Sequence, residues 1–237
     1  SMTFLLVSRM AHHYPNGMTR LVYLIVSYWF GFFNHLFFLL VFAVLISFCW
    51  RKGRKILGIY ALSAAVIMSL SGAINAGLIT VRTEVVKMND LPDHWDGKKI
   101  LLLTDIHLGI TNGPRTMRKI VQKSLSLHPD LILIGGDLQD NRITEEDVYS
   151  AIFRPLVESA PVFRISGNHE QYADLEQSRL FALKMGLTDI DHHIMDLDGL
   201  LIRGVPFSRK AQEIDPVPDD QPAILLAHTP DYQLIQN

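Results

Sequence analysis

Several short apolar segments of this chain are followed by Asp, His and Asn, which are residue types that can act as metal ligands. Residues 99–104 read as a buried strand and run into Asp105-Ile-His107. Side chains at i and i+2 of a strand point to the same side, so Asp105 and His107 converge if the extended geometry continues. An Asp-x-His pair often occurs by chance, so it is evidence for a metal site only if other strands are followed by similar residues. Three further segments do so: 131–134 before Gly136-Asp137-Leu-Gln-Asp140, 161–165 before Gly167-Asn168-His169-Glu170, and 223–227 before His228.

The residues between these segments have the periodicity of helices. Apolar residues recur at helical spacing after Pro114, and Pro129 ends that pattern. Thr144-Glu-Glu-Asp147 resembles a capping box that starts a helix to about Ser159. A further helix is expected over 175–185, and short strands near 190–196 and 200–205 flank the turn at 198–199. Strand–helix alternation predicts an α/β fold with a largely parallel sheet, in which sites form beyond the carboxyl ends of the strands.

The first part of the chain has a different composition. Residues 21–50 and 56–81 contain no charged residue, and each run is long enough to cross a membrane as a helix. Asn34 and His35 interrupt the first run; we expect one unbroken helix, with this pair either contacting a neighbouring helix or forming a site. A buried soluble hairpin is the alternative, but both runs exceed the usual length of a core helix.

A basic segment, Arg51-Lys-Gly-Arg-Lys55, separates the two apolar runs. Positive charges mark cytoplasmic loops, so two spans would place the later residues on the extracytoplasmic side of the cell membrane. The sequence thus predicts an N-terminal segment (1–20), two transmembrane helices in contact with membrane lipids (21–81), a linker (82–97) and a soluble domain (98–237).

The ligand types after the strands suit a pair of divalent metal ions. Each ion needs several N or O ligands, and one carboxylate can bridge the two. Gly135 and Gly136 would let the backbone turn tightly before Asp137. Such a pair clamps a phosphate ester and generates hydroxide at neutral pH, while a histidine can protonate the leaving group. His, Asp and Asn ligands do not distinguish Mn, Fe, Zn and Co.

These motifs, in this order, resemble the calcineurin-like metallophosphoesterases over residues 98–237, in particular a membrane-anchored bacterial branch of that family. The resemblance implies a layered α/β sandwich and hydrolysis of a phosphate ester or phosphoanhydride by a metal-bound hydroxide. Alternatives from the residues alone are that Asp140 caps a helix and that Glu170 lies on the surface. The implied roles are these: Asp105 and His107 bind the first metal, Asp137 bridges, Asn168 and His228 bind the second, His169 with Asp140 is the acid dyad, and Glu170 supports the ligands.

One part of the family pattern has no counterpart here. The final Gly-His-x-His is absent, since nine residues follow His228. We therefore expect a C-terminally incomplete sandwich in which each metal lacks one histidine, and we interpret the sequence as truncated rather than as a disused site.

The net charge of the chain and its predicted membrane anchor exclude some classes of function. A net charge of −2 and a membrane anchor argue against a nuclease of the same superfamily, and the single Cys49 excludes disulfides within the chain. We expect a phosphorylated small-molecule or lipid-linked substrate, possessing either a monoester or a diester. The rival interpretation is a catalytically incomplete binding or sensing protein. His192 and His193 are interpreted as surface or sheet residues, and Arg142 as either a phosphate contact or a surface residue.

Overall fold

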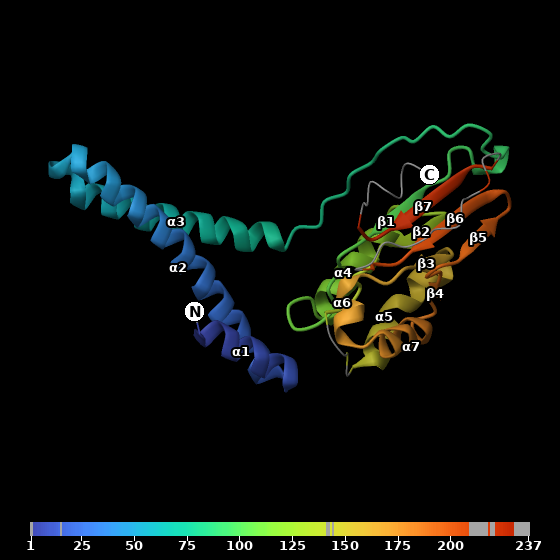
Figure 1. Ribbon diagram of the computed structural model, residues 1–237, viewed down its shortest axis with the longest axis horizontal. Helices are drawn as coiled ribbons and strands as arrows, with labels where there is room; N and C mark the ends of the chain where they lie inside the picture. Colours follow the sequence, from blue (N-terminus) through green and yellow to red (C-terminus); the bar gives the residue numbers. More distant parts are fainter. Residues whose placement is uncertain are drawn as a thin grey trace. The chain divides into compact units, whose positions relative to one another are not determined.

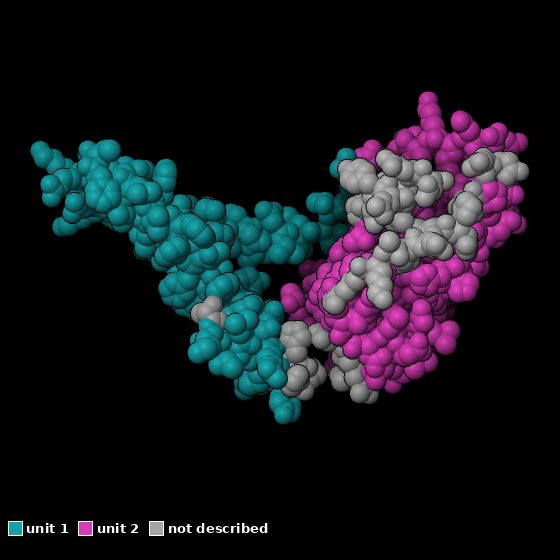
Figure 2. Space-filling view, viewed as in Figure 1, with its two compact units in different colours: residues 1–82 teal, residues 83–237 magenta. Residues whose placement is uncertain are grey.

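The computed structural model describes residues 2–14, 16–140, 143, 145–208, 218 and 221–229. The chain divides into two compact units, residues 1–82 and 83–237 (Figure 2). Two of the expectations above fall on residues outside this description: Thr144 of the expected capping box, and Arg142.

The first unit is helical. It contains α1 (Met2–His13), α2 (Gly17–Cys49), the 3-10 turn η1 (Arg51–Gly53) and α3 (Arg54–Ala76), and α2 packs along α3 (Figure 1). Asn16 caps α2, because its side chain accepts the N–H groups of Met18 and Thr19. Within the described residues, two helices are long and apolar enough to cross a membrane: Gly17–Cys49 and Arg51–Ala76.

Details of this unit differ from the sequence-based expectation. Helix α2 runs unbroken through Asn34 and His35, as predicted, and His35 Nδ1 lies 3.1 Å from Ser69 Oγ on α3. The expected loop at Arg51–Lys55 is instead a 3-10 turn, Arg51–Gly53, that leads directly into α3 at Arg54. Helix α3 ends at Ala76 rather than near Val81, and α1 was not expected at all.

The second unit is a three-layer α/β structure. In the described part of the chain, a parallel sheet has the order β1 (Ile100–Leu103), β2 (Leu131–Ile134), β3 (Val162–Arg164) and β4 (Thr188–Asp189). A second sheet contains β5 (Ile194–Leu197), β6 (Leu200–Val205) and β7 (Ala223–Ala227). The second sheet packs on one face of the parallel sheet. Three helices cover the opposite face: α4 (Pro114–Leu125), α5 (Glu146–Ser159) and α7 (Leu175–Lys184) (Figure 1).

Two apolar cores hold these layers together. One joins the parallel sheet to α4, α5 and α7, with Phe153 and Met117 fully buried. The other lies between the two sheets and includes Leu133 and Ile202. The predicted α/β fold with a parallel sheet is therefore confirmed, including a hairpin turn at Asp198-Gly199, where both residues have positive φ.

Strand β1 is not the buried strand that its four apolar residues suggested. It lies at an edge of the parallel sheet, and its exposure alternates, so that Leu102 is 58% exposed while Leu101 and Leu103 pack against the helical core. An apolar run without alternation cannot distinguish a central strand from an edge strand. The strand pairing matters for function, because Leu103, Ile134 and Arg164 pair in one row and bring the residues after each strand side by side.

The helical core gives a first prediction. Phe153→Ala removes a fully buried ring from α5 and should reduce the free energy of unfolding of the second unit by about 3–5 kcal/mol. The urea midpoint, read from Trp95 fluorescence in a detergent-solubilised chain whose Trp29 and Trp50 are replaced by Phe, measures this loss. Leu180→Ala, at an exposed position of α7, is the matched control and should leave the midpoint almost unchanged. Equal midpoints for both variants would contradict the assigned core.

Candidate metal centre

The segments that follow β1 and β2 stay paired beyond the strands. The backbone N–H groups of Asp105 and His107 donate to the carbonyl oxygens of Gly136 and Asp137, at 3.2 and 2.9 Å. The backbone does not remain extended, however: Asp105, His107 and Asp137 have φ of 54°, 50° and 50°. Such left-handed conformations are strained for residues other than glycine and concentrate at functional sites. Asp105 and His107 thus converge as expected, but through a left-handed turn rather than an i, i+2 strand.

The carboxylate of Asp137 is buried at the centre of the convergence. Its Oδ1 accepts the backbone N–H of His169 at 2.8 Å. Its Oδ2 faces the Nε2 atoms of His228, His107 and His169, at 3.5, 3.8 and 4.0 Å. One oxygen is therefore fixed by the backbone, and the other is directed at imidazole nitrogens from separate segments of the chain.

Close packing of backbone makes glycine necessary at two positions. A Cβ on Gly167 would lie 2.1 Å from Asp137 Oδ1, and one on Gly136, whose φ is +91°, would lie 2.7 Å from His228 Nδ1. Any side chain at either position would displace Asp137 or His228.

Glu170 joins the turn after β2, which carries Asp137, to the turn after β3, which carries Asn168. It is buried on the short helix α6 (Asn168–Ala173), which the sequence did not predict. Its Oε2 accepts the backbone N–H groups of Gly167 and Asp137, at 2.8 and 3.0 Å, and its Oε1 accepts that of Gln139 at 3.1 Å. The alternative that Glu170 is a surface residue is wrong, because its carboxylate satisfies backbone donors that would otherwise be buried without partners.

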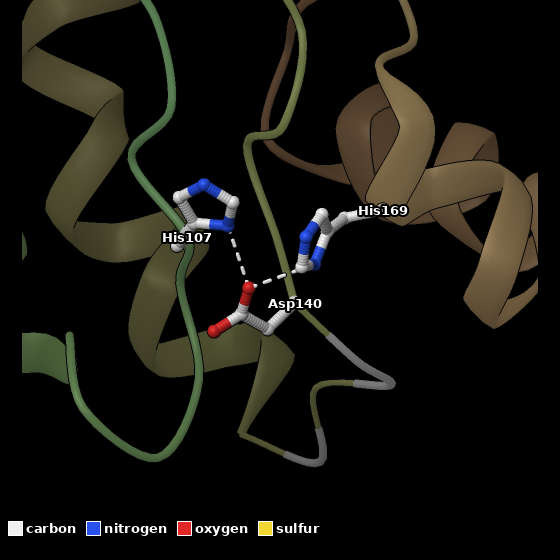
Figure 3. A group of neighbouring side chains, drawn as sticks. All are labelled: His107, Asp140 and His169. Atoms are coloured by element: carbon white, nitrogen blue, oxygen red, sulfur yellow. Dashed lines mark hydrogen bonds and ion pairs between the residues drawn. The ribbon is translucent and has the colours of Figure 1, made fainter.

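Asp140 lies between two imidazoles (Figure 3). Its Oδ1 is 3.0 Å from His169 Nδ1, the contact implied by the family resemblance, and 2.6 Å from His107 Nδ1, a contact the sequence did not indicate. His107 Nδ1 is hydrogen-bonded to this oxygen and donates to it, whereas the contact of His169 Nδ1 is an ion-pair distance. A neutral His107 then carries its lone pair on Nε2, which faces Asp105 Oδ1 at 3.7 Å and Asp137 Oδ2 at 3.8 Å.

A backbone hydrogen bond likewise determines the tautomer of His228. Its Nδ1 lies 2.9 Å from the carbonyl oxygen of Gly135, which can only accept a hydrogen bond, so Nδ1 carries the proton. The Nε2 lone pair of the neutral ring faces Asn168 Oδ1 at 3.0 Å and Asp137 Oδ2 at 3.5 Å. These three atoms are the N and O donor types that a divalent metal ion binds.

The donor atoms fit a pair of metal ions in their chemistry and spacing. They form two sets, Asp105–His107–Asp137 and Asn168–His228–Asp137, which share Asp137. Donors that bind one ion at ~2.0–2.2 Å and at ordinary angles lie roughly 3–3.6 Å apart, and the separations of 3.0–3.8 Å within these sets are close to this range. All of the predicted site residues lie together at this edge of the sheet.

A buried charge network next to the site was missed by the sequence analysis. Asp191 accepts the backbone N–H and the hydroxyl of Ser166, at 2.8 and 2.7 Å, just before Gly167. Arg164 is fully buried and lies 2.9 Å from Asp189, and Arg179 pairs with Asp191. Burial lowers the pKa of Arg179, but the hydrogen bond to Asp191 and the charge of Asp189 outweigh it, so the pKa is raised. The sequence contained one indication of this network: Arg164 is a charged residue within the otherwise apolar run 161–165.

Sequence comparison shows which known proteins this chain is similar to. The family model for calcineurin-like phosphoesterases matches residues 98–235. An uncharacterized metallophosphoesterase of Helicobacter pylori J99 is 32% identical over 142 residues, which cover 56% of this chain and 38% of that protein. A protein of Bos taurus named "Transmembrane protein with metallophosphoesterase domain" is 28% identical over 223 residues, covering 76% of this chain and 49% of the relative.

A shorter match, 33% identical over 84 residues, is to Phosphodiesterase YaeI of Escherichia coli K12 and covers 35% of this chain and 31% of that protein. The chain thus spans about half the length of these curated relatives or less. The matched family region nevertheless includes every motif of the metal centre and more than half of the residues, and the chain belongs to the calcineurin-like phosphoesterase family.

Proposed function

We propose that this chain binds two divalent metal ions and hydrolyses a phosphate ester or phosphoanhydride at the surface of a membrane. The observation that carries the proposal is the position of Asp137 Oδ2, which faces the Nε2 atoms of His107 and His228. These nitrogens come from different segments and each has a second oxygen donor beside it. Membership of the family supports hydrolysis of phosphoester bonds as the reaction.

The ligands divide between the two ions. Asp105 and His107 hold the first, Asn168 and His228 hold the second, and Asp137 bridges them. When bound, the ions supply Lewis acidity, which activates a water molecule and neutralises charge on the phosphate. The donor set accommodates Mn, Fe, Zn or Co, and binding of any of these requires the neutral histidine tautomers that Asp140 and Gly135 select.

His169 is the general acid in this proposal. Its Nδ1 lies 3.0 Å from Asp140 Oδ1, and its Nε2 faces the centre at 4.0 Å from Asp137 Oδ2. A proton on Nε2 can pass to the departing oxygen of the substrate, and the Asp140 carboxylate stabilises the imidazolium before that transfer. The half-exposed ring of His169 is accessible to a bound ester.

Glu170 is proposed to keep the metal ligands in register. Its carboxylate spans the turns that carry Asp137 and Asn168, so it controls the separation of these two ligands. Groups that orient ligands in this way usually affect metal affinity by 10–100-fold when they are replaced.

Helices α2 and α3 are proposed to anchor the enzyme. Their length and low polarity support spanning, and the bovine relative is named as a transmembrane protein. The basic residues at Arg51–Lys55 would lie at the cytoplasmic face in contact with anionic lipids, which puts the second unit on the extracytoplasmic side. A lipid-linked or other envelope substrate suits that location.

The metal requirement can be measured directly. Elemental analysis of the detergent-solubilised chain should find close to two divalent ions, and chelation should abolish hydrolysis of bis(p-nitrophenyl) phosphate until Mn²⁺ is restored. Asp137→Asn should lose about 100-fold or more of this activity, because both ions lose a ligand charge. His94→Ala, at an exposed position outside the site, is the control. Stoichiometric metal without turnover, in a protein that also carries the Gly-His-x-His of the family, would favour a binding or sensing protein over an enzyme.

Glu170 provides a test of ligand positioning. Glu170→Gln places an amide N–H₂ against backbone donors, and it should weaken Mn²⁺ binding by about 10–100-fold and lower the unfolding free energy by roughly 1–3 kcal/mol. Isothermal titration calorimetry measures the affinity. Glu176→Gln, on an exposed side chain, should behave as wild type. Unchanged affinity in Glu170→Gln would exclude the proposed positioning role.

Membrane orientation is tested with fusions to a phosphatase reporter that is active only after export. A reporter fused after Asn237 should be active, and one inserted between Gly53 and Arg54 should be inactive, because the positive-inside rule retains the basic turn in the cytoplasm. The opposite pattern would overturn the proposed orientation.

A further inference from the structure

Two aromatic side chains, Tyr172 and Phe207, form what we call the aromatic wall beside the metal centre. Tyr172 follows His169 by three residues on α6 and therefore lies on the same face of that helix. The ring centroids of His169 and Tyr172 are 6.1 Å apart. Phe207 follows β6, and its ring centroid is 6.3 Å from that of His228. The wall thus connects the proposed general acid with a proposed metal ligand.

Phe207 is held in place by hydrogen bonds to residues next to the site, and Tyr172 contacts its ring. The backbone N–H of Phe207 donates to the carbonyl of Ser166 at 2.9 Å, and the side-chain amide of Gln171 donates to the carbonyl of Phe207. Tyr172 and Phe207 meet nearly edge to face, with centroids 6.4 Å apart and an angle of 77° between the planes. Their position is therefore determined by the same turn, Ser166-Gly167, that carries Asn168 and His169.

Exposure indicates that the wall does more than fill space. Tyr172 is 57% exposed, and Phe207 is only partly buried. Aromatic rings that serve packing alone are mostly covered, because their large apolar area stabilises the fold only when it is removed from water. Exposed ring surface next to converging histidines is instead available to a group bound at the centre.

We propose that the aromatic wall selects substrates whose phosphate carries an aromatic ring on the His169 side. This inference rests on the proposed function, since it assumes that a phosphate binds among the ligands of Asp137. The perpendicular rings present both a face and an edge, which are the surfaces that a third aromatic ring contacts favourably. A saturated group of the same size gains the apolar contact but not this electrostatic match.

Three phosphonates test the proposal without turnover, because they contain no ester bond to hydrolyse. Isothermal titration of the full chain with Mn²⁺ should show that phenylphosphonate binds roughly 5- to 10-fold more tightly than methylphosphonate, and more tightly than cyclohexylphosphonate. Tyr172→Leu and Phe207→Leu should each reduce the preference for the phenyl compound while leaving methylphosphonate within about 2-fold of wild type. Tyr172→Phe keeps the ring and should bind all three compounds as wild type does.

The outcomes separate this inference from the proposed function. Equal binding of phenyl- and cyclohexylphosphonate, or an unchanged preference in the leucine variants, overturns the aromatic wall and leaves the metal centre standing. Failure of all three compounds to bind wild-type protein overturns both proposals. If Phe207→Leu does not fold, Tyr172→Leu decides the question, because its side chain is largely exposed.

Discussion

A buried carboxylate with one oxygen left for external ligands is the constraint on which this site depends. Burying the charge of Asp137 is costly unless it is compensated. The backbone N–H of His169 compensates Oδ1, and Oδ2 is left facing imidazole nitrogens that present lone pairs rather than protons. A metal ion at the centre, as proposed, would balance these facing acceptor atoms. Left-handed backbone at Asp105, His107 and Asp137, and glycine at 136 and 167, are the local consequences of bringing the strand ends this close together.

The surrounding groups make this geometry rigid rather than adaptable. Glu170 ties the turns after β2 and β3 to each other through backbone N–H groups, and Asp191 secures Ser166 on the far side of the same turn. Asp140 extends the coupling to the histidines, because its Oδ1 accepts the Nδ1–H of His107 and lies 3.0 Å from Nδ1 of His169. A metal ligand and the proposed general acid thus depend on one carboxylate, so that a change at Asp140 would disturb binding and proton transfer together.

Much of this could be predicted from the sequence, for identifiable reasons. Apolar runs that end in Asp, His and Asn located the strands, and the periodicity after Pro114 located α4, because both patterns are local. The exposed face of β1 and the contact from Asp140 to His107 depend on which segments become neighbours, and no local pattern reports that. Helix α6 was missed because its six residues are shorter than a periodic pattern can reveal. Glu170 is buried because its carboxylate accepts hydrogen bonds from backbone N–H groups of two turns. The sequence cannot predict these contacts, because they depend on how the turns lie in the folded structure.

The central claim is that Asp137 is shared by two metal ions, and electron paramagnetic resonance of the Mn²⁺-loaded chain tests it most directly. Two Mn²⁺ ions bridged by one carboxylate are exchange-coupled, so the fully loaded wild-type protein should give a coupled spectrum. Asp137→Asn should give the spectrum of isolated Mn²⁺. An isolated-ion spectrum from wild-type protein at full loading would contradict the bridging role of Asp137 and the dinuclear centre built on it.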